Sequence, residues 1–128
     1  MGLAEDSPFF PIAKDAVIVE NPDCVAFFDR YPVSRGHALV VPNRVVGSIF
    51  DLDARVQAEI WETVGRVRDI LTEMFNPDGF NIGVNDGKAA GQTVAHTHVH
   101  VIPRYIGDVG DPRGGIRWVI PEKTRYWD

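Results

Sequence analysis

The chain of 128 residues contains only four histidines, and three of them occupy alternate positions. His96, His98 and His100 recur at every second residue, and His37 follows a glycine earlier in the sequence. Imidazole is the side chain that acts as a nucleophile, a general base or a metal ligand near neutral pH. Because so scarce a residue type is clustered, we expect a chemical site here rather than a plain polar strand face.

The spacing of the three histidines disfavours a shared metal ion. Residues 94–102 alternate β-branched residues with histidines and stop before Pro103, which predicts a strand. The three rings would then lie on one face of that strand. At about 3.3 Å per residue, the backbones of His96 and His100 would lie roughly 13 Å apart. Two nitrogens that bind one zinc ion lie within about 4 Å of each other. One ion could bind an adjacent pair of these histidines but hardly all three, so a three-histidine metal site is the weaker interpretation.

The loop that precedes the histidines favours phosphate binding. Residues 85–93 contain Gly87 and Gly91 and end in Gln92-Thr93. The backbone N–H groups of such a loop can face an anion, because no bulky side chain blocks a close approach. An ordinary turn at residues 85–87 is the alternative for the first part of this loop. Beside three histidines, the loop indicates a phosphate site.

Together these motifs resemble the histidine triad (HIT) superfamily of nucleotidyl hydrolases and transferases. The sequence His-Thr-His-Val-His-Val-Ile at 96–102 matches the family pattern, except that Thr97 replaces an apolar residue. The likeness runs from about Ile12 to Tyr105. Gln-Thr-Val before the triad and Ile-Pro-Arg after it are similar to the branch that holds fragile histidine triad proteins and bacterial dinucleoside polyphosphate hydrolases. Residues 107–118 resemble the C-terminal tail of the bacterial members.

The resemblance implies a catalytic role for each histidine. His98 corresponds to the nucleophile that attacks the α-phosphorus and forms a nucleotidyl-histidine intermediate. His96 and His100 correspond to flanking residues that orient the nucleophile, bind phosphate oxygens and help to pass a proton to the leaving group. His37 corresponds to a further site histidine near the phosphates.

The resemblance also implies a set of nucleotide-binding residues. Asp29 matches the position near the ribose, where a carboxylate can accept two hydrogen bonds, although a turn or cap carboxylate is the plain alternative. Asn85 and Gln92 match polar positions along the phosphate chain. Thr93 can add a donor, and Gly91 belongs to the phosphate loop.

The implied activity is hydrolysis of a nucleotide at its α-phosphate through the covalent His98 intermediate. Dinucleoside polyphosphates such as diadenosine tetraphosphate are the expected substrates, with AMP as a product. A nucleoside phosphoramidase that cuts P–N bonds, and a nucleotide-binding signalling module with incidental catalysis, remain as alternatives. No cofactor is required, although Mg²⁺ can accompany a polyphosphate substrate.

A structural zinc ion is not expected. Some members of the family hold zinc with a cysteine pair near the N-terminus and histidines from the body of the domain. In this chain residues 7–10 contain no cysteine, and Val45 stands where zinc-binding members often have histidine. The only cysteine, Cys24, lies in an apolar stretch.

Composition predicts a single cytoplasmic domain over residues 1–128, with an N-terminal extension (1–11) and a C-terminal tail (107–128). The formal net charge of −5 disfavours a nucleic-acid partner, which generally requires a basic face. One cysteine suits a reducing compartment. No apolar stretch approaches the roughly 20 residues that a membrane span needs, and no signal peptide is recognised.

The remaining sequence predicts the scaffold. Short strands are expected at residues 16–20, 24–29, 37–41 and 79–84, and apolar residues at helical spacing predict one long helix from Leu52 to Phe75. This order favours the α+β class: a HIT-like fold with a mostly antiparallel five-stranded sheet, one long helix, and a short extra helix or tail. The family forms homodimers through this helix and an edge strand. Trp61 is a candidate for that contact, with core burial as the alternative.

Overall fold

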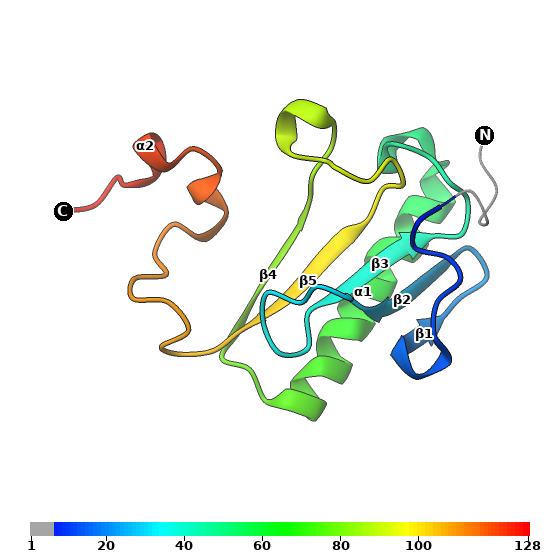
Figure 1. Cartoon of the computed structure of the whole chain (residues 1–128), viewed down its shortest axis with the longest axis horizontal. Helices are drawn as coiled ribbons and strands as arrows, with labels where there is room; N and C mark the ends of the chain where they lie inside the picture. Colours follow the sequence, from blue (N-terminus) through cyan, green and yellow to red (C-terminus); the bar gives the residue numbers. More distant parts are fainter. Residues whose placement is uncertain (1–6) are drawn as a thin grey trace.

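The structure is a computed structural model that describes residues 7–128. Within these residues, one antiparallel sheet has the strand order β1-β2-β3-β5-β4 (Figure 1). Its strands are β1 (Val17–Glu20), β2 (Cys24–Phe28), β3 (Ala38–Pro42), β4 (Gly79–Val84) and β5 (Val99–Arg104). The predicted α+β class, with a five-stranded antiparallel sheet and one long helix, is confirmed.

Helix α1 (Ala54–Phe75) begins and ends at local signals in the sequence. The Asp53 carboxylate accepts a hydrogen bond from the Val56 amide at 3.0 Å and caps the first turn. Asn76 adopts the left-handed conformation with φ of 50° and ends the helix before Pro77. The buried residues recur every three or four positions, so that one stripe faces the sheet. They are Val56, Ile60, Thr63, Val64, Val67 and Leu71.

The sheet has two apolar faces because side chains alternate along its strands. Ala26 and Val40 belong to the core beneath α1, whereas their neighbours Phe27 and Leu39 belong to a second cluster on the opposite face. Helix α1 covers the first face (Figure 1). Phe9, Phe10, Ile12 and Val17 pack against the second cluster. The histidine site lies on this second face.

The strand predicted at residues 94–102 is wrong at its start, since β5 begins at Val99. Residues 94–98 approach the sheet as an irregular segment. The Thr97 amide donates to the Val46 carbonyl at 2.8 Å, outside the ladder of the sheet. Of the three alternating histidines, only His100 lies in the strand, so the three rings do not share one strand face.

Short helices complete the chain. Three of them, η2 (Lys14–Ala16), η3 (Ile49–Asp51) and η4 (Lys88–Ala90), lie in connections, and η5 (Gly115–Val119) and α2 (Pro121–Thr124) form the C-terminal tail beyond β4 (Figure 1). Thr124 is buried and Trp127 is half-buried within this tail. No helix in the described part of the chain is long and apolar enough to cross a membrane.

Trp61 lies on the outer side of α1 with 63% of its surface exposed. Burial in the core, one of the two explanations for this residue, is therefore wrong for the single chain.

Gly36 links the fold to the histidine site, because it precedes His37 in the turn before β3. Its φ is +89°, and a Cβ atom there would lie 2.7 Å from the Phe75 ring. We expect Gly36→Ala to lower the free energy of unfolding by about 1–3 kcal/mol through backbone strain and overlap. Gly47→Ala is the matched control, since no atom lies within 4 Å of a Cβ there. Equal denaturant midpoints for the two variants would contradict this account.

Candidate active site

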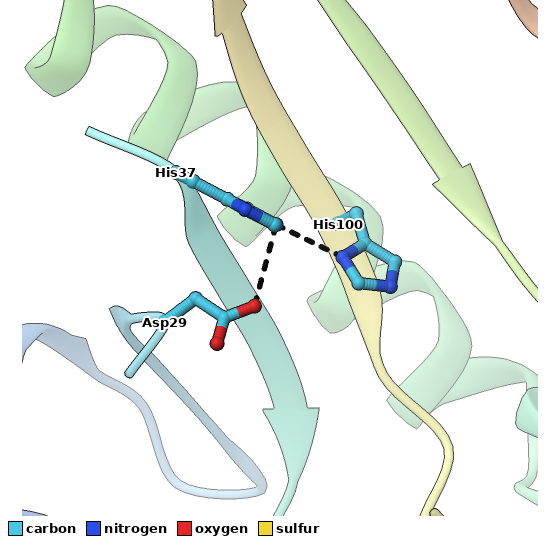
Figure 2. Close-up of side chains that lie close together, drawn as sticks. All are labelled: Asp29, His37 and His100. Carbon is cyan, nitrogen blue, oxygen red and sulfur yellow. Dashed lines mark hydrogen bonds and ion pairs between the residues drawn. The ribbon is translucent and has the colours of Figure 1, made fainter. Parts of the chain in front are cut away.

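Three chain segments meet at the histidine site. Asp29 directly follows β2, His37 directly precedes β3, and His100 is the second residue of β5. The Asp29 amide donates to the His37 carbonyl at 2.9 Å, and Leu39 of β3 pairs with His100. Val99 and Val101, which flank His100, belong to the core beneath α1. The His100 ring therefore lies on the opposite face of the sheet. Figure 2 shows the three side chains directed toward one another.

A backbone carbonyl sets the tautomer of the neutral His98 ring. Its Nδ1 lies 2.9 Å from the carbonyl oxygen of His96. Since a carbonyl only accepts hydrogen bonds, Nδ1 carries the proton, and Nε2 of the neutral ring keeps its lone pair. The His98 ring lines a cavity and lies 5.0 Å from the His100 ring between centroids.

A chain of hydrogen bonds fixes the proton of His100. The Val33 amide donates to Nδ1 of His37 at 3.1 Å, so the neutral His37 ring carries its proton on Nε2. That Nε2 lies 3.0 Å from Nδ1 of His100 and 3.5 Å from Oδ2 of Asp29 (Figure 2). Because Nδ1 of His100 accepts, the remaining proton of the neutral His100 ring sits on Nε2. We refer to Val33, His37 and His100 as the relay.

Burial keeps the rings of the relay neutral. The pKa of His100 is lowered to about 4, mainly by burial and also by the neighbouring His98 and His37 rings, against an opposing effect of Asp29. The pKa of His37 is also lowered, mainly by burial, while the Asp29 carboxylate acts in the opposite direction. Neutral rings at pH 7 are the state that the hydrogen bonds of the relay require.

His96 differs from its expected role. Its ring is fully buried, and its Nε2 donates to the Pro42 carbonyl at 2.7 Å while its Nδ1 accepts from the Ser7 hydroxyl. Burial lowers its pKa. The predicted contact between this side chain and phosphate oxygens is therefore wrong in this structure, because the irregular approach to β5 turns the ring inward. The backbone carbonyl of His96 instead orients the His98 ring.

The Gln92 side chain also differs from its expected role, because the phosphate loop uses all of its polar atoms. Its Oε1 accepts from the Gly87 amide at 2.9 Å, and its Nε2 donates to the carbonyls of Gly47 at 2.8 Å and Val94 at 3.0 Å. A direct contact between this side chain and phosphate would break that network. Gln92 closes the loop, whereas Asn85, Gly91 and Thr93 line the cavity.

The cavity beside His98 has a volume of about 440 Å³ and one apolar and one polar side. Phe9, Phe27, Leu39 and Val94 supply apolar surface. The polar side includes Asp29, Asn85, Thr93, His98 and His100. Such a volume and mixed lining are typical of small-molecule sites. Because the ligand predicted from the sequence is a nucleotide, we call it the nucleotide cavity.

Asp29 makes the turn interaction that was its alternative role, and its role at the ribose stays a prediction. Its Oδ1 accepts from the Tyr31 amide at 2.9 Å, which is a turn interaction, while the residue also lines the nucleotide cavity. Ser7 and Val33 were not recognised in the sequence. Neither belongs to a motif, and Ser7 lies 89 residues from its partner His96.

Asp29, His37 and His100 have ligand atoms within 4.8 Å of one another, a spacing that a metal ion could occupy. The relay weighs against that use. Nδ1 of His37 already accepts from the Val33 amide, so a metal on Nε2 would require this ring to lose both protons. The cluster fits a hydrogen-bond relay better than a metal centre.

Comparison with known proteins agrees with this geometry. Residues 12–107 match the model of the HIT domain. The chain is 44% identical over 79 residues to a bis(5'-adenosyl)-triphosphatase of Dictyostelium discoideum, covering 62% of this chain and 53% of that protein. It is 35% identical over 102 residues to an asymmetrical bis(5'-nucleosyl)-tetraphosphatase of Schizosaccharomyces pombe, covering 80% and 56%.

A solved structure of a Zn-bound histidine triad family protein from Mycobacterium smegmatis is also similar. It superposes with a TM-score of 0.68 at 37% identity, covering 73% of this chain and 68% of that one. The chain spans about half the length of the two curated relatives. The histidine triad and the sheet lie within the residues that match the family model. The chain therefore belongs to the HIT domain family.

Proposed function

We propose that the protein hydrolyses nucleotides by attack of His98 on the α-phosphorus. The observation that carries this proposal is the pair of fixed rings at the nucleotide cavity. Nε2 of His98 has a free lone pair, and Nε2 of the adjacent His100 carries a proton. One ring is a nucleophile and the other is a hydrogen-bond donor, which is the arrangement that displacement at phosphorus requires.

The proposed reaction has two steps. In the first, the lone pair of His98 Nε2 forms a bond to the α-phosphorus, and the leaving oxygen departs with the electron pair of the P–O bond. His100 stabilises that oxygen by donating a hydrogen bond from Nε2. In the second, water attacks the nucleotidyl-histidine and the P–N bond breaks with its electron pair going to Nε2 of His98. One proton of the water is released to solvent, and the other stays on the phosphate of AMP.

We propose dinucleoside polyphosphates such as diadenosine tetraphosphate as the substrate class, with AMP as one product. The names of the two curated relatives support this choice. The nucleotide cavity offers Phe9 and Phe27 for a base and the Asp29 carboxylate for a ribose. Asn85, Gly91 and Thr93 line the same cavity, and we propose that they face the phosphates.

We further propose a homodimer with no resident metal, although Mg²⁺ can accompany a polyphosphate substrate. Strand β4 is at the edge of the sheet, and Trp61 and Met74 of α1 are exposed by 63% and 55%. An edge strand, together with large exposed apolar side chains on α1, favours a contact with a second copy. A cytoplasmic location stays a prediction from the sequence.

His98→Ala tests the nucleophile. We expect the native protein to release AMP from diadenosine tetraphosphate and to show a nucleotidyl mass adduct after acid quenching. The variant should show no adduct and should lose at least about 10³-fold in turnover, because the covalent route is closed. Retained AMP binding by the variant is the control for folding. Nucleotide binding by the native protein without turnover or adduct would instead favour a binding module.

Substitutions at His37 test the relay. His37→Leu removes the donor to Nδ1 of His100, so the His100 proton is free to leave Nε2. We expect kcat to fall by about 10²–10³-fold, the usual effect of losing one such donor in the transition state. His37→Gln retains an amide N–H donor and should recover part of that loss. Equal activities for the Leu and Gln variants would show that His37 acts only through packing.

Native mass spectrometry tests assembly and metal content together. We expect the mass of a dimer without zinc, and Trp61→Glu should give monomers at the same concentration because it places charges in the contact. Met74→Glu is a second probe of the same face. A monomeric native protein would contradict the proposed assembly, and one retained zinc ion per chain would contradict the proposed metal content.

A further inference from the structure

The segment that precedes β1 forms one wall of the nucleotide cavity. Pro8 and Phe9 line the cavity, and the Phe9 ring contacts the His98 ring edge-on with 5.1 Å between centroids. Ser7 comes directly before them and is only 4% exposed. A buried hydroxyl is expected to have a hydrogen-bond partner. Ser7 has its partner 89 residues further along the chain, in the ring of His96.

The Ser7 hydroxyl is the donor in its bond to His96. Nε2 of His96 donates to the Pro42 carbonyl, so the neutral ring carries its proton there and Nδ1 accepts. The hydroxyl therefore donates its proton to Nδ1. Its oxygen in turn accepts from the Phe9 amide at 3.2 Å. Each donor in this series faces an acceptor, which fixes the direction of every bond.

Loss of the Ser7 hydroxyl would leave Nδ1 of His96 buried without this donor, which is unfavourable. The ring could not compensate by moving its proton to Nδ1, because Nε2 and the Pro42 carbonyl would then be two facing acceptors. The ring would have to turn or shift. It has no exposed surface, and it packs against Phe9 and Phe10 at 5.6 and 5.7 Å between centroids. A shift of the ring would therefore move the His96 backbone with it.

The backbone of His96 carries such a movement to His98. The His96 carbonyl accepts from Nδ1 of His98 at 2.9 Å, and this bond sets the tautomer of the attacking ring. One residue thus joins Ser7 on its side chain to His98 on its backbone. A small displacement is sufficient to affect the reaction, since misplacement by about 1 Å can lower a rate by roughly 10²-fold.

We propose that Ser7 is a positioning residue for His98 and that it acts through His96. The hydroxyl holds the His96 ring, and the ring holds the irregular chain whose carbonyl keeps the proton of His98 on Nδ1. Ser7 itself does not line the nucleotide cavity. The inference rests on the proposed function, because the lone pair on Nε2 of His98 matters for catalysis only if His98 attacks phosphorus.

Ser7→Ala tests this coupling in the protein without substrate. By ¹⁵N NMR at neutral pH, we expect the ratio of Nδ1-protonated to Nε2-protonated His98 to fall by about twofold or more, the change that weakening one hydrogen bond allows. The kcat for AMP release from diadenosine tetraphosphate should fall by about 10–10²-fold. The Kd for AMP should change less than kcat, because the lost hydroxyl does not line the cavity.

Ser48→Ala is the matched control. The Ser48 hydroxyl oxygen makes the same local bond as Ser7, since it accepts from the amide two residues ahead, that of Phe50, at 3.2 Å. Within residues 7–128, its hydroxyl makes no hydrogen bond to a histidine. We expect this variant to keep the native tautomer ratio and the native kcat. Ser7→Thr retains a hydroxyl and should recover part of the loss seen in Ser7→Ala.

Three results would overturn the role of Ser7. A native tautomer ratio in Ser7→Ala would mean that the His96 carbonyl keeps its place without the hydroxyl. Equal changes in Ser7→Ala and Ser7→Thr would assign the effect to packing, and equal changes in Ser7→Ala and Ser48→Ala would assign it to the loss of a turn bond.

Failure of the proposed function is recognised separately, because the tautomer ratio is measured without turnover. A native protein that neither releases AMP nor forms an adduct would overturn the proposed function, and the catalytic role of Ser7 with it, whatever the tautomer of His98. A native protein that turns over, with Ser7→Ala unchanged in both tautomer ratio and kcat, would overturn the role of Ser7 alone.

Discussion

The hydrogen bond from Nδ1 of His98 to the carbonyl of His96 is the constraint on which the site depends. This bond uses a backbone acceptor, so the tautomer of the neutral His98 ring is determined by the path of the chain. A regular strand through residues 96–100 would direct that carbonyl to a neighbouring strand. The buried His96 ring, bonded to Ser7 and to the Pro42 carbonyl, holds the chain in the irregular path instead.

A backbone group also determines the tautomers on the donor side of the site. The Val33 amide orients His37, and His37 orients His100, so that a backbone group again sets the position of a proton. Burial reinforces this arrangement because it lowers the pKa values of His37 and His100 and keeps both rings neutral. A net hydrogen bond is worth only about 0.5–1.5 kcal/mol. That is enough to favour one tautomer of each ring by a factor of roughly 2–13, and neighbouring bonds in a network strengthen one another.

Much of the scaffold could be predicted from the sequence. The apolar residues at helical spacing predicted α1, and the short apolar runs predicted most of the strands. The path of residues 94–98 could not be predicted, because the alternation of histidines favours a strand whereas the Val46 carbonyl and the buried Ser7 favour a bend. The same tertiary contacts turned His96 inward. Gln92 was assigned to phosphate, since the sequence does not show that the loop uses its amide to close on Gly47.

The position of the C-terminal tail could not be predicted from the sequence either. Its resemblance to bacterial relatives predicted a segment, but not the position of Ile116 and Val119 beside His100. That position depends on the contact of Ile116 with Gly83 and on the Arg117 bonds within the tail. These contacts join residues far apart in the chain, and no local pattern encodes them.

The most direct test of the central claim, that the fold fixes the ring protons before substrate binds, is ¹⁵N NMR of the histidine side chains in the ligand-free protein at neutral pH. The account predicts a neutral His98 ring protonated on Nδ1, and neutral His37 and His100 rings protonated on Nε2. A His98 ring protonated on Nε2, or a His100 ring protonated on Nδ1, would contradict it. Substrate binding would then have to move the ring protons before His98 could attack and His100 could donate.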